Sequence, residues 1–384
     1  MTTPTQALPA TTASGTSPVK GNPWHPTFRG VALATWIELL RRRPSKKGYI
    51  AFGIAFVAIV GLAVLAALTA GPELSSVPFE LVLILILGSG MLIGPSLSAT
   101  SINGDSSEGV LAPMQMTRLT AGDLAIGKLV SSWLVCIAAL LATTPLLVVS
   151  YLRSGWHLGE LALALVTILL LVLAFTAVGL AWSSIAARAV ASVSLTHLTT
   201  GLMVLGTLLL FFFTMPLVSE DIPITSRDLD YSKMTEDQMN DPTFDASTLP
   251  CVDIESIYTI NHTEHTAWLL LINPVMTLVE QAPRVDPETY AEDGRAMPGV
   301  FQQLHQSVSG ARMGPEMPQA YDGCTGDYGD ENAWAKRQHA EAMYPPNPWP
   351  GLALTGLLLL GSMWIVTRRL RVPYRKLRTG TRVA

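Results

Sequence analysis

Charged residues are scarce in this chain of 384 residues: Asp, Glu, Lys and Arg make up 14% of it, whereas a soluble domain usually has about 25%. The shortage is greatest between Tyr49 and Ser219, where long stretches carry hardly a charge. This composition excludes an ordinary soluble enzyme and a disordered protein. The net charge of −4 and the lack of a basic domain also argue against binding to nucleic acid.

Long hydrophobic runs take the place of the missing charges. A helix that spans a bilayer needs about 20 mostly apolar residues. Lone strands cannot satisfy their backbone polar groups in lipid, so each such run predicts a helix. Six segments qualify, at residues 49–70, 77–99, 126–152, 160–183, 192–218 and 349–367.

The distribution of Lys and Arg predicts the orientation of these spans. Seven of these residues precede the first span and seven follow the last one. We therefore expect both ends in the cytoplasm, which requires an even number of spans, and a multi-pass protein of the plasma membrane. The segment 219–348, with 22 acidic and 7 basic residues, would then lie outside.

Cysteine is also rare, with three residues in the whole chain. Cys136 falls inside the third span, where we expect a small apolar packing residue. Cys251 and Cys324 both fall in the outer segment, and an oxidising compartment there favours a disulfide between them. The alternative is two free thiols. A bridge would close a loop of about 70 residues.

Residues 1–22 are rich in Thr, Pro, Ser and Ala and have no apolar core, so we expect no signal peptide. We expect a disordered cytoplasmic tail over residues 1–25. The first span would then serve as its own insertion signal.

Residues 26–43 predict an amphipathic helix before the first span. It ends at Arg41, Arg42 and Arg43, which precede Pro44. A helix of this kind suits the inner membrane surface, with the arginines at anionic head groups and Trp36 at the interface. The alternative is a soluble helix. The apolar side consists of Phe28, Ala32, Trp36, Leu39 and Leu40.

The loop between the second and third spans, residues 100–124, is longer than a plain connection needs. Thr120 followed by Asp123 predicts a helix cap at its end. Before that cap we expect a short helix parallel to the membrane that exposes Met114, Met116 and Leu119 to a cytoplasmic partner. The alternative is a solvated connector whose apolar residues rest on lipid.

This loop resembles the first cytoplasmic loop of ABC-2 type transporter permeases. Six spans, cytoplasmic ends, the preceding interfacial helix and Asn273–Pro274 before the last span are also similar to that family. The chain departs from the family at Val110, where Thr is common, and at Pro113. The matching loop residues are Glu108, Gly109, Val110, Leu111, Thr117, Leu119, Thr120, Gly127 and Lys128.

The resemblance implies a permease subunit that pairs with a second copy or a paralogue and sits on two ATPase subunits. The segment from Glu108 to Leu119, with Leu111, Met114 and Met116, would be the coupling helix that docks on the ATPase. The helix with Trp36 and Arg41–Arg43 would flank the same joint. This chain has no G-x-x-x-x-G-K-[ST] phosphate loop, so ATP and Mg²⁺ would be bound by the partner chain. We expect no cofactor and no catalytic residue on this chain.

Other polar groups give weaker signals. Within the spans ionisable residues look nearly absent, with His197 as the exception and a possible intramembrane polar site; a hydrogen bond to a neighbouring helix is the simpler role. This scarcity favours an apolar or amphipathic cargo such as a lipid, peptide or drug. The outer segment has His262, Glu264 and His265, and the two histidines could face one way. Zinc needs three or four ligands and nothing in the sequence fixes the others, so we expect no metal.

The sequence as a whole predicts an all-α membrane protein with six spans. Residues 26–48 would form the interfacial helix, 49–218 the first five spans, 349–367 the sixth and 368–384 a basic cytoplasmic tail. Residues 219–348 would form a mixed, loop-rich outer domain held by the disulfide. Within it, residues 268–280 predict one helix that is too short to cross and that packs against the outer ends of the spans or re-enters between them. The main rival is a non-transport membrane protein whose outer domain binds a partner. An intramembrane enzyme ranks last, since only His197 would be available.

Overall fold

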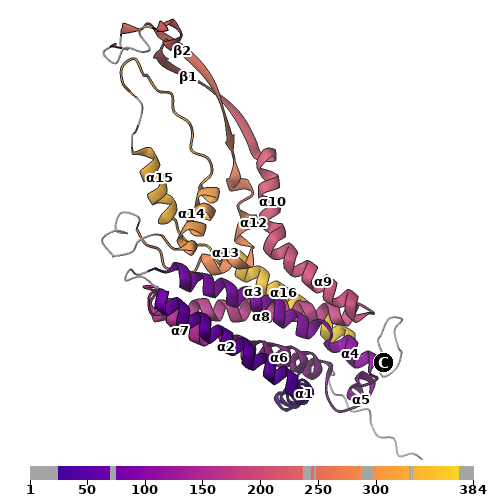
Figure 1. Cartoon of the computed structure of the whole chain (residues 1–384). Helices are drawn as coiled ribbons and strands as arrows, with labels where there is room; N and C mark the ends of the chain where they lie inside the picture. Colours follow the sequence, from indigo (N-terminus) through magenta and orange to yellow (C-terminus); the bar gives the residue numbers. More distant parts are fainter. Residues whose placement is uncertain are drawn as a thin grey trace, which may run out of the picture.

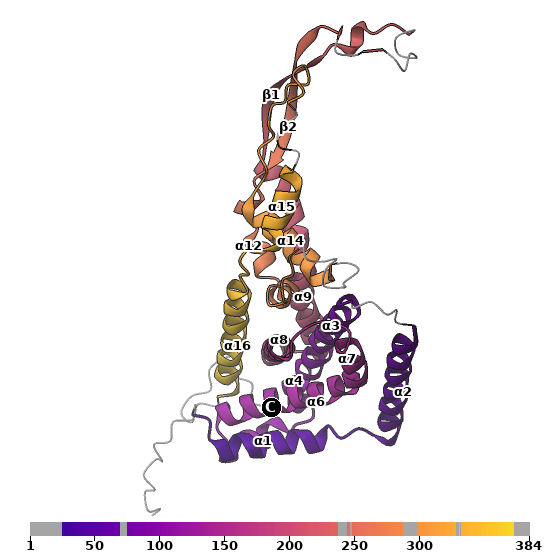
Figure 2. The same ribbon diagram turned by 90° about the vertical axis from the view of Figure 1, so that its left-hand side faces the viewer.

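A computed structural model describes residues 25–69, 75–236, 244–245, 248–286, 298–327, 330 and 332–371. It is a bundle of helices from which a long two-stranded ribbon projects (Figures 1 and 2). The predicted disordered tail, apart from His25, and the basic tail after Arg371 lie outside the described residues. We call the end of the bundle that carries helix α1 (Phe28–Arg41) the α1 face, and residues 219–348 the ribbon region.

Six helical segments in the described chain are long and apolar enough to cross a membrane, which confirms the predicted number and supports a multi-pass membrane protein. The third begins at Ala121, five residues before the predicted start, because a capping box between Thr120 and Asp123 opens it. The cap itself was correctly predicted. The six segments are Lys46–Leu65, Val77–Ser107, Ala121–Tyr151, Leu158–Ile185, Ala189–Val218 and Trp349–Leu370.

Several of these segments are composite. The second combines α3 with a short α4, and the third combines α6 with α7. In the fifth, a five-residue π-helical turn, Leu202–Gly206, separates two α-helices. The helices of the membrane part are α1 (Phe28–Arg41), α2 (Lys46–Thr69), α3 (Val77–Ala99), α4 (Ser101–Ser107), α5 (Leu111–Gln115), α6 (Ala121–Leu140), α7 (Thr144–Tyr151), α8 (Leu158–Ile185), α9 (Ala189–Gly201), α10 (Thr207–Thr214) and α16 (Trp349–Leu370).

The core of the bundle forms around α8, which packs on α3, α6, α9 and α16. Small residues let α3 and α8 approach closely: a Cβ on Gly90 would meet the side chain of Val172. By contrast, α2 touches mainly α7 and the turn before it, and Figure 2 shows it standing apart from the other helices. Its side chains are largely exposed apolar groups, as expected of a helix surrounded by lipid.

The ribbon region begins directly after the fifth span. Strands β1 (Ser219–Leu229) and β2 (Cys251–Asn261) pair antiparallel along their whole length, from Ser219↔Asn261 to Leu229↔Cys251. The described part of this region also contains α12 (Trp268–Leu271), α13 (Pro274–Val279), α14 (Val300–Met313) and α15 (Ala333–Ala342). The region mixes helices and strands, and its most extended feature is the regular ribbon of β1 and β2, which the sequence did not predict.

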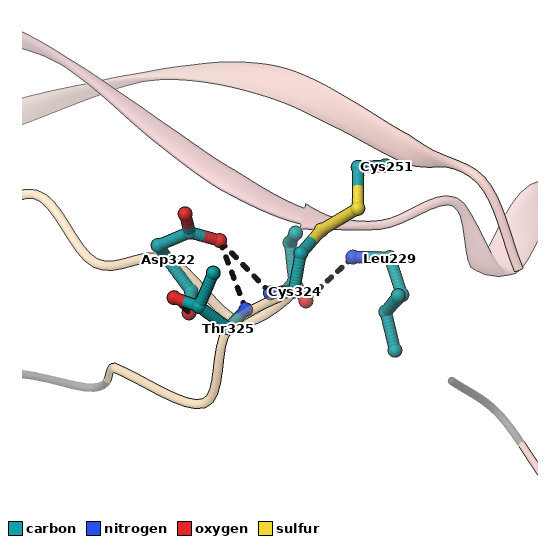
Figure 3. Close-up of a disulfide and its surroundings, with 6 residues drawn as sticks. Leu229, Cys251, Asp322, Cys324 and Thr325 are labelled. Carbon is teal, nitrogen blue, oxygen red and sulfur yellow. Dashed lines mark hydrogen bonds between the residues drawn. A yellow bond between two sulfur atoms is a disulfide. The ribbon is translucent and has the colours of Figure 1, made fainter. Parts of the chain in front are cut away.

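The predicted disulfide joins Cys251 to Cys324, whose Cα atoms are 6.2 Å apart (Figure 3). It fastens the loop after α14 to the end of the ribbon that is farthest from α9 and α10 (Figure 1). The same loop is hydrogen-bonded to β1, where Arg227 N–H donates to the Tyr321 carbonyl at 2.9 Å and Gly323 N–H donates to the Arg227 carbonyl at 2.8 Å. Asp322 Oδ1 accepts the backbone N–H groups of Cys324 and Thr325 (Figure 3).

The prediction of one helix over residues 268–280 is wrong, because the segment breaks into α12 and α13. Asn273 causes the break: its Oδ1 accepts the N–H of Val275 at 2.8 Å and so caps α13, while Pro274 suits the first turn of a new helix. The Asn273 side chain is fully buried, and its amide donates to the carbonyl of Val204 at 2.7 Å. This bond ties the ribbon region to the π-helical turn of the fifth span.

Candidate functional site: a charged joint between α1, α4 and α6

Helix α1 lies across one end of the bundle and packs on α6 (Figure 2). The contact uses small residues: a Cβ added to Gly127 would lie 2.5 Å from the Cβ of Ala34. The side of α1 that is buried consists of Gly30, Ala34, Thr35 and Glu38, so it is small and polar. The close approach therefore brings the polar groups of the two helices within reach of each other.

At one end of this contact, Asp123 joins the first turns of both helices. Its carboxylate accepts the backbone N–H of Thr27 at 2.6 Å and that of Thr120 at 2.9 Å. Thr27 and Thr120 are the N-cap residues of α1 and α6. A carboxylate between two helix N-termini is stabilised by both dipoles and by the free N–H groups there. Asp123, which is 1% exposed, thus fixes the start of α1 on α6.

At the other end, Lys128 of α6 is buried between two carboxylates. Its ammonium group forms ion pairs with Glu38 of α1 and Asp105 of α4. It also donates to the carbonyl and hydroxyl oxygens of Ser101, both at 3.4 Å. The side chains of Lys128, Glu38 and Asp105 are 1%, 4% and 4% exposed. One lysine therefore links three helices through bonds that water does not screen.

Two arginines complete the cluster at its rim. Arg41 donates to Asp105 Oδ1 at 2.8 Å and to Glu108 Oε2 at 3.3 Å, and Arg42 lies 3.7 Å from Glu38. Lys128, Arg41 and Arg42 thus face Glu38, Asp105 and Glu108, so three positive charges balance three negative ones. We call these six residues the charged joint.

The surroundings shift the arginine pKa values in opposite directions. Burial alone lowers the pKa of Arg41, but the hydrogen bond and charge of Asp105, with Glu38 and Glu108, outweigh it and leave that pKa raised. For Arg42 burial is the larger effect, and the pKa is lowered despite Glu38. A guanidinium stays charged at any physiological pH in both cases. The charged joint therefore does not switch through its arginines.

The expectation that Arg41, Arg42 and Arg43 all meet lipid head groups is corrected by these contacts. Arg41 and Arg42 bind carboxylates of the protein, although the Arg41 side chain stays 33% exposed, and Arg43 is exposed as well. Apolar residues of α1 are exposed instead, with Phe28 at 91% and Trp36 at 58%. A helix that buries Glu38 and exposes Trp36 is suited to rest on an apolar medium.

The short helix α5 follows the charged joint. Leu111 is fully buried, and Met114 and Leu119 are partly buried against a core cluster that contains Ile102 and Leu124. The expectation that Met114, Met116 and Leu119 are exposed together therefore holds only for Met116, which is 86% exposed. Three apolar residues beside a core gain more from packing on it than from staying free.

A turn at Gly109 and a hydrogen bond from Gln115 fix the position of this segment. Gly109 adopts a φ of +70°, which ends α4 in a conformation that side chains disfavour. The Gln115 amide donates to the carbonyl of Leu370 at 3.2 Å, which connects α5 with the end of the sixth span. Glu108, expected to serve a partner, is exposed but bound to Arg41.

His197 forms a hydrogen bond across the bundle. Its Nε2 lies 3.0 Å from Ser96 Oγ of α3, so the simpler predicted role fits the geometry. The expectation that His197 is the exceptional ionisable residue of the spans is wrong, because Lys128 also lies inside one. The role of Lys128 is hard to infer from the sequence, because Glu38 and Asp105 are 90 and 23 positions away. The usable signal was that Lys128 is the single charged residue in the predicted span 126–152.

The sequence matches no model of a known protein family, and a search of curated proteins finds no match either.

Proposed function

We propose that this chain is the permease subunit of an ABC exporter that moves an apolar or amphipathic cargo, acts as a dimer and is driven by a separate ATPase. The observation that carries the proposal is the charged joint. The charged joint makes α1, α4 and α6 one mechanical unit at the α1 face. The exposed Met116 lies at the end of α5, the short helix that follows α4. A docking protein that moves this segment would move two spans with it.

The contacts give a route for such a movement. Leu111 is fully buried in the core cluster, so α5 cannot shift without displacing the helices around it. Gln115 passes the displacement to the end of α16, and Lys128 passes it from α4 to α6 and α1. Met116 is a suitable anchor for a partner, since an exposed unbranched thioether adapts to an apolar groove.

A second function is favoured by one feature of the ribbon. Its residues are exposed on both faces, including Ile257 at 72% and Tyr258 at 41%. A projecting ribbon with exposed apolar side chains suits a binding module for another protein. In that case the spans would anchor the ribbon, and the α1 face would need no partner.

The test compares two methionines. Met116→Glu places a charge on the α1 face, and Met317→Glu places the same charge on a residue of the ribbon region that is 58% exposed. The tagged full-length chain is captured from its native membranes in mild detergent, and the bound proteins are identified and quantified. We expect wild type and Met317→Glu to retain a stoichiometric ATPase with a phosphate loop, and Met116→Glu to lose it. Absence of an ATPase from wild type, while a control transporter keeps its own, contradicts the proposal and favours the binding module.

A further inference from the structure

A group of histidine and glutamate side chains lies at the base of the ribbon, where the chain leaves β2. It contains His262, Glu264 and His265, and each offers one ligand atom within 4.8 Å of the others. His262 Nδ1 lies 2.8 Å from Glu264 Oε1. The imidazole rings of His262 and His265 are stacked with centroids 6.0 Å apart. Three ligands of the two types that zinc commonly takes, imidazole and carboxylate, are thus already gathered.

A fourth residue supports the group from the other strand. Glu220 of β1 places Oε2 3.3 Å from His262 Nε2. A histidine that binds metal through one ring nitrogen usually donates its other N–H to a carboxylate, which fixes the ring and its tautomer. His262 has this arrangement, with Nδ1 toward Glu264 and Nε2 toward Glu220.

Glu264 has spare coordinating capacity. Its Oε2 is shielded from solvent and has no hydrogen-bond partner among the described residues. An unpartnered carboxylate oxygen is costly when it is buried, and a metal ion would satisfy it. Gly314 lies against the same carboxylate: a Cβ there would come within 2.5 Å of Oε2, and its φ of +78° also favours glycine. The space beside Glu264 is therefore kept free of a side chain.

The backbone holds these residues in place. His262 N–H donates to the carbonyl of Val218 at 2.8 Å, and the Thr263 hydroxyl donates to the carbonyl of Ala311 at 3.1 Å. The first bond ties the turn to the end of the fifth span, and the second ties it to α14. A site built on a turn fixed at both sides needs little rearrangement to bind.

We propose that His262, Glu264 and His265 bind a divalent cation of the zinc type, with Glu220 orienting His262 through its second ring nitrogen. The expectation of no metal rested on the lack of further ligands fixed near the two histidines. The fold places Glu264 beside them as a third ligand and Glu220 as the support. Three protein ligands leave one position for water or an exogenous ligand. A bound ion would also join β1 to the turn and stiffen the base of the ribbon.

The experiment uses the full-length chain in detergent, carrying a tag without histidine and stripped of metal with a chelator. Zn²⁺ is titrated by calorimetry and by competition with a chromogenic chelator, and Co²⁺ is added separately to record its visible absorption. We expect one Zn²⁺ per chain with a dissociation constant of about 1 μM or tighter. The Co²⁺ spectrum should show the intense bands of a four-coordinate site.

Three variants locate the ion. His265→Ala should weaken binding on the order of 100-fold or more, and Glu220→Gln, which keeps all three ligands, by about 10-fold to 100-fold. His339→Ala is the matched control, since His339 lies 3.2 Å from Asp286 in the same region. It should bind as wild type does. Gel filtration and formation of the Cys251–Cys324 bridge verify that each variant is folded. Absence of stoichiometric binding in wild type, or equal affinity in folded His265→Ala, overturns the proposal.

Discussion

The two ends of the molecule each contain a lysine–aspartate ion pair, and the pairs differ in their surroundings. At the α1 face, the side chains of Lys128 and Asp105 are 1% and 4% exposed. In the ribbon region, those of Lys336 and Asp330 are 70% and 40% exposed. Water screens the second pair, whereas the first depends on its protein partners for all of its stabilisation. The same chemical pair should thus be essential at one end and dispensable at the other.

Replacing the two lysines in turn gives the largest expected difference. Lys128→Met removes the buried cation between Glu38 and Asp105 and leaves only Arg41 and Arg42 at the rim to balance them. We therefore expect a loss of about 3 to 5 kcal/mol in the free energy of unfolding. Lys336→Met should leave it unchanged within error, because an isolated surface pair contributes little. Unfolding of both variants in mixed micelles with increasing SDS measures the difference.

The double variant Lys128→Met/Glu38→Gln separates charge balance from packing. It removes one positive and one negative charge. Arg41 keeps its ion pairs with Asp105 and Glu108, while Arg42 loses its partner Glu38. We expect it to regain most of the stability that Lys128→Met loses. If the double variant is as unstable as the single one, the shape of the lysine side chain and not its charge holds the joint together.

This comparison also marks what the sequence could and could not predict. Hydropathy gave the six spans, and local chemistry gave the Thr120–Asp123 cap, because both depend on residues close in sequence. The disulfide was also found, since only two cysteines fall in the outer segment. The charged joint depends on Glu38 and Lys128, which are 90 positions apart, and no local pattern connects them.

The ribbon escaped prediction for a different reason. Alternation of polar and apolar residues appears in a strand when one face is buried. Only Ser226 of β1 and Ile260 of β2 are buried, so neither strand has a buried face that would require regular alternation. Helix α5 shows the opposite error: its apolar residues were assigned to a partner, but Leu111 packs into the core of the same chain. The apolar composition of a segment shows that another surface will cover it. It does not show whether that surface belongs to the same chain or to a partner.

A smaller effect should follow removal of the disulfide, and it should be confined to the ribbon region. The bridge links residues 73 positions apart. A two-stranded ribbon is marginally stable in water, so the bridge contributes much of its order, typically about 2 to 4 kcal/mol. We expect Cys324→Ser to make residues near β2 more sensitive to limited proteolysis, with cleavage sites located by mass spectrometry.

Cys136→Ser is the matched control for that experiment. Cys136 is buried in α6 and is the only free cysteine among the described residues. Its replacement should leave proteolysis of the ribbon at the wild-type rate. Equal proteolysis of Cys324→Ser and wild type would show that hydrogen bonds such as that of Gly323 to Arg227 hold the ribbon without the bridge.

The smallest effect concerns Asp330 and sharpens the contrast between the two ion pairs. The hydrogen bond from Lys336, with a smaller one from Asn332 N–H, lowers the pKa of Asp330 below its ordinary value of 3.8. A carboxylate with a lowered pKa stabilises the fold at pH values above its unfolded pKa, and this contribution is lost as the pH falls through the folded pKa. We therefore expect the first turn of α15 to fray only below about pH 4. Hydrogen exchange of that turn, corrected for the intrinsic rate at each pH, should show this onset.

In Lys336→Met the onset should move up toward the ordinary aspartate value, while the rest of the chain exchanges as before. An unchanged onset would mean that Asn332, and not the exposed lysine, sets the pKa, which would reduce the contribution of the surface pair still further.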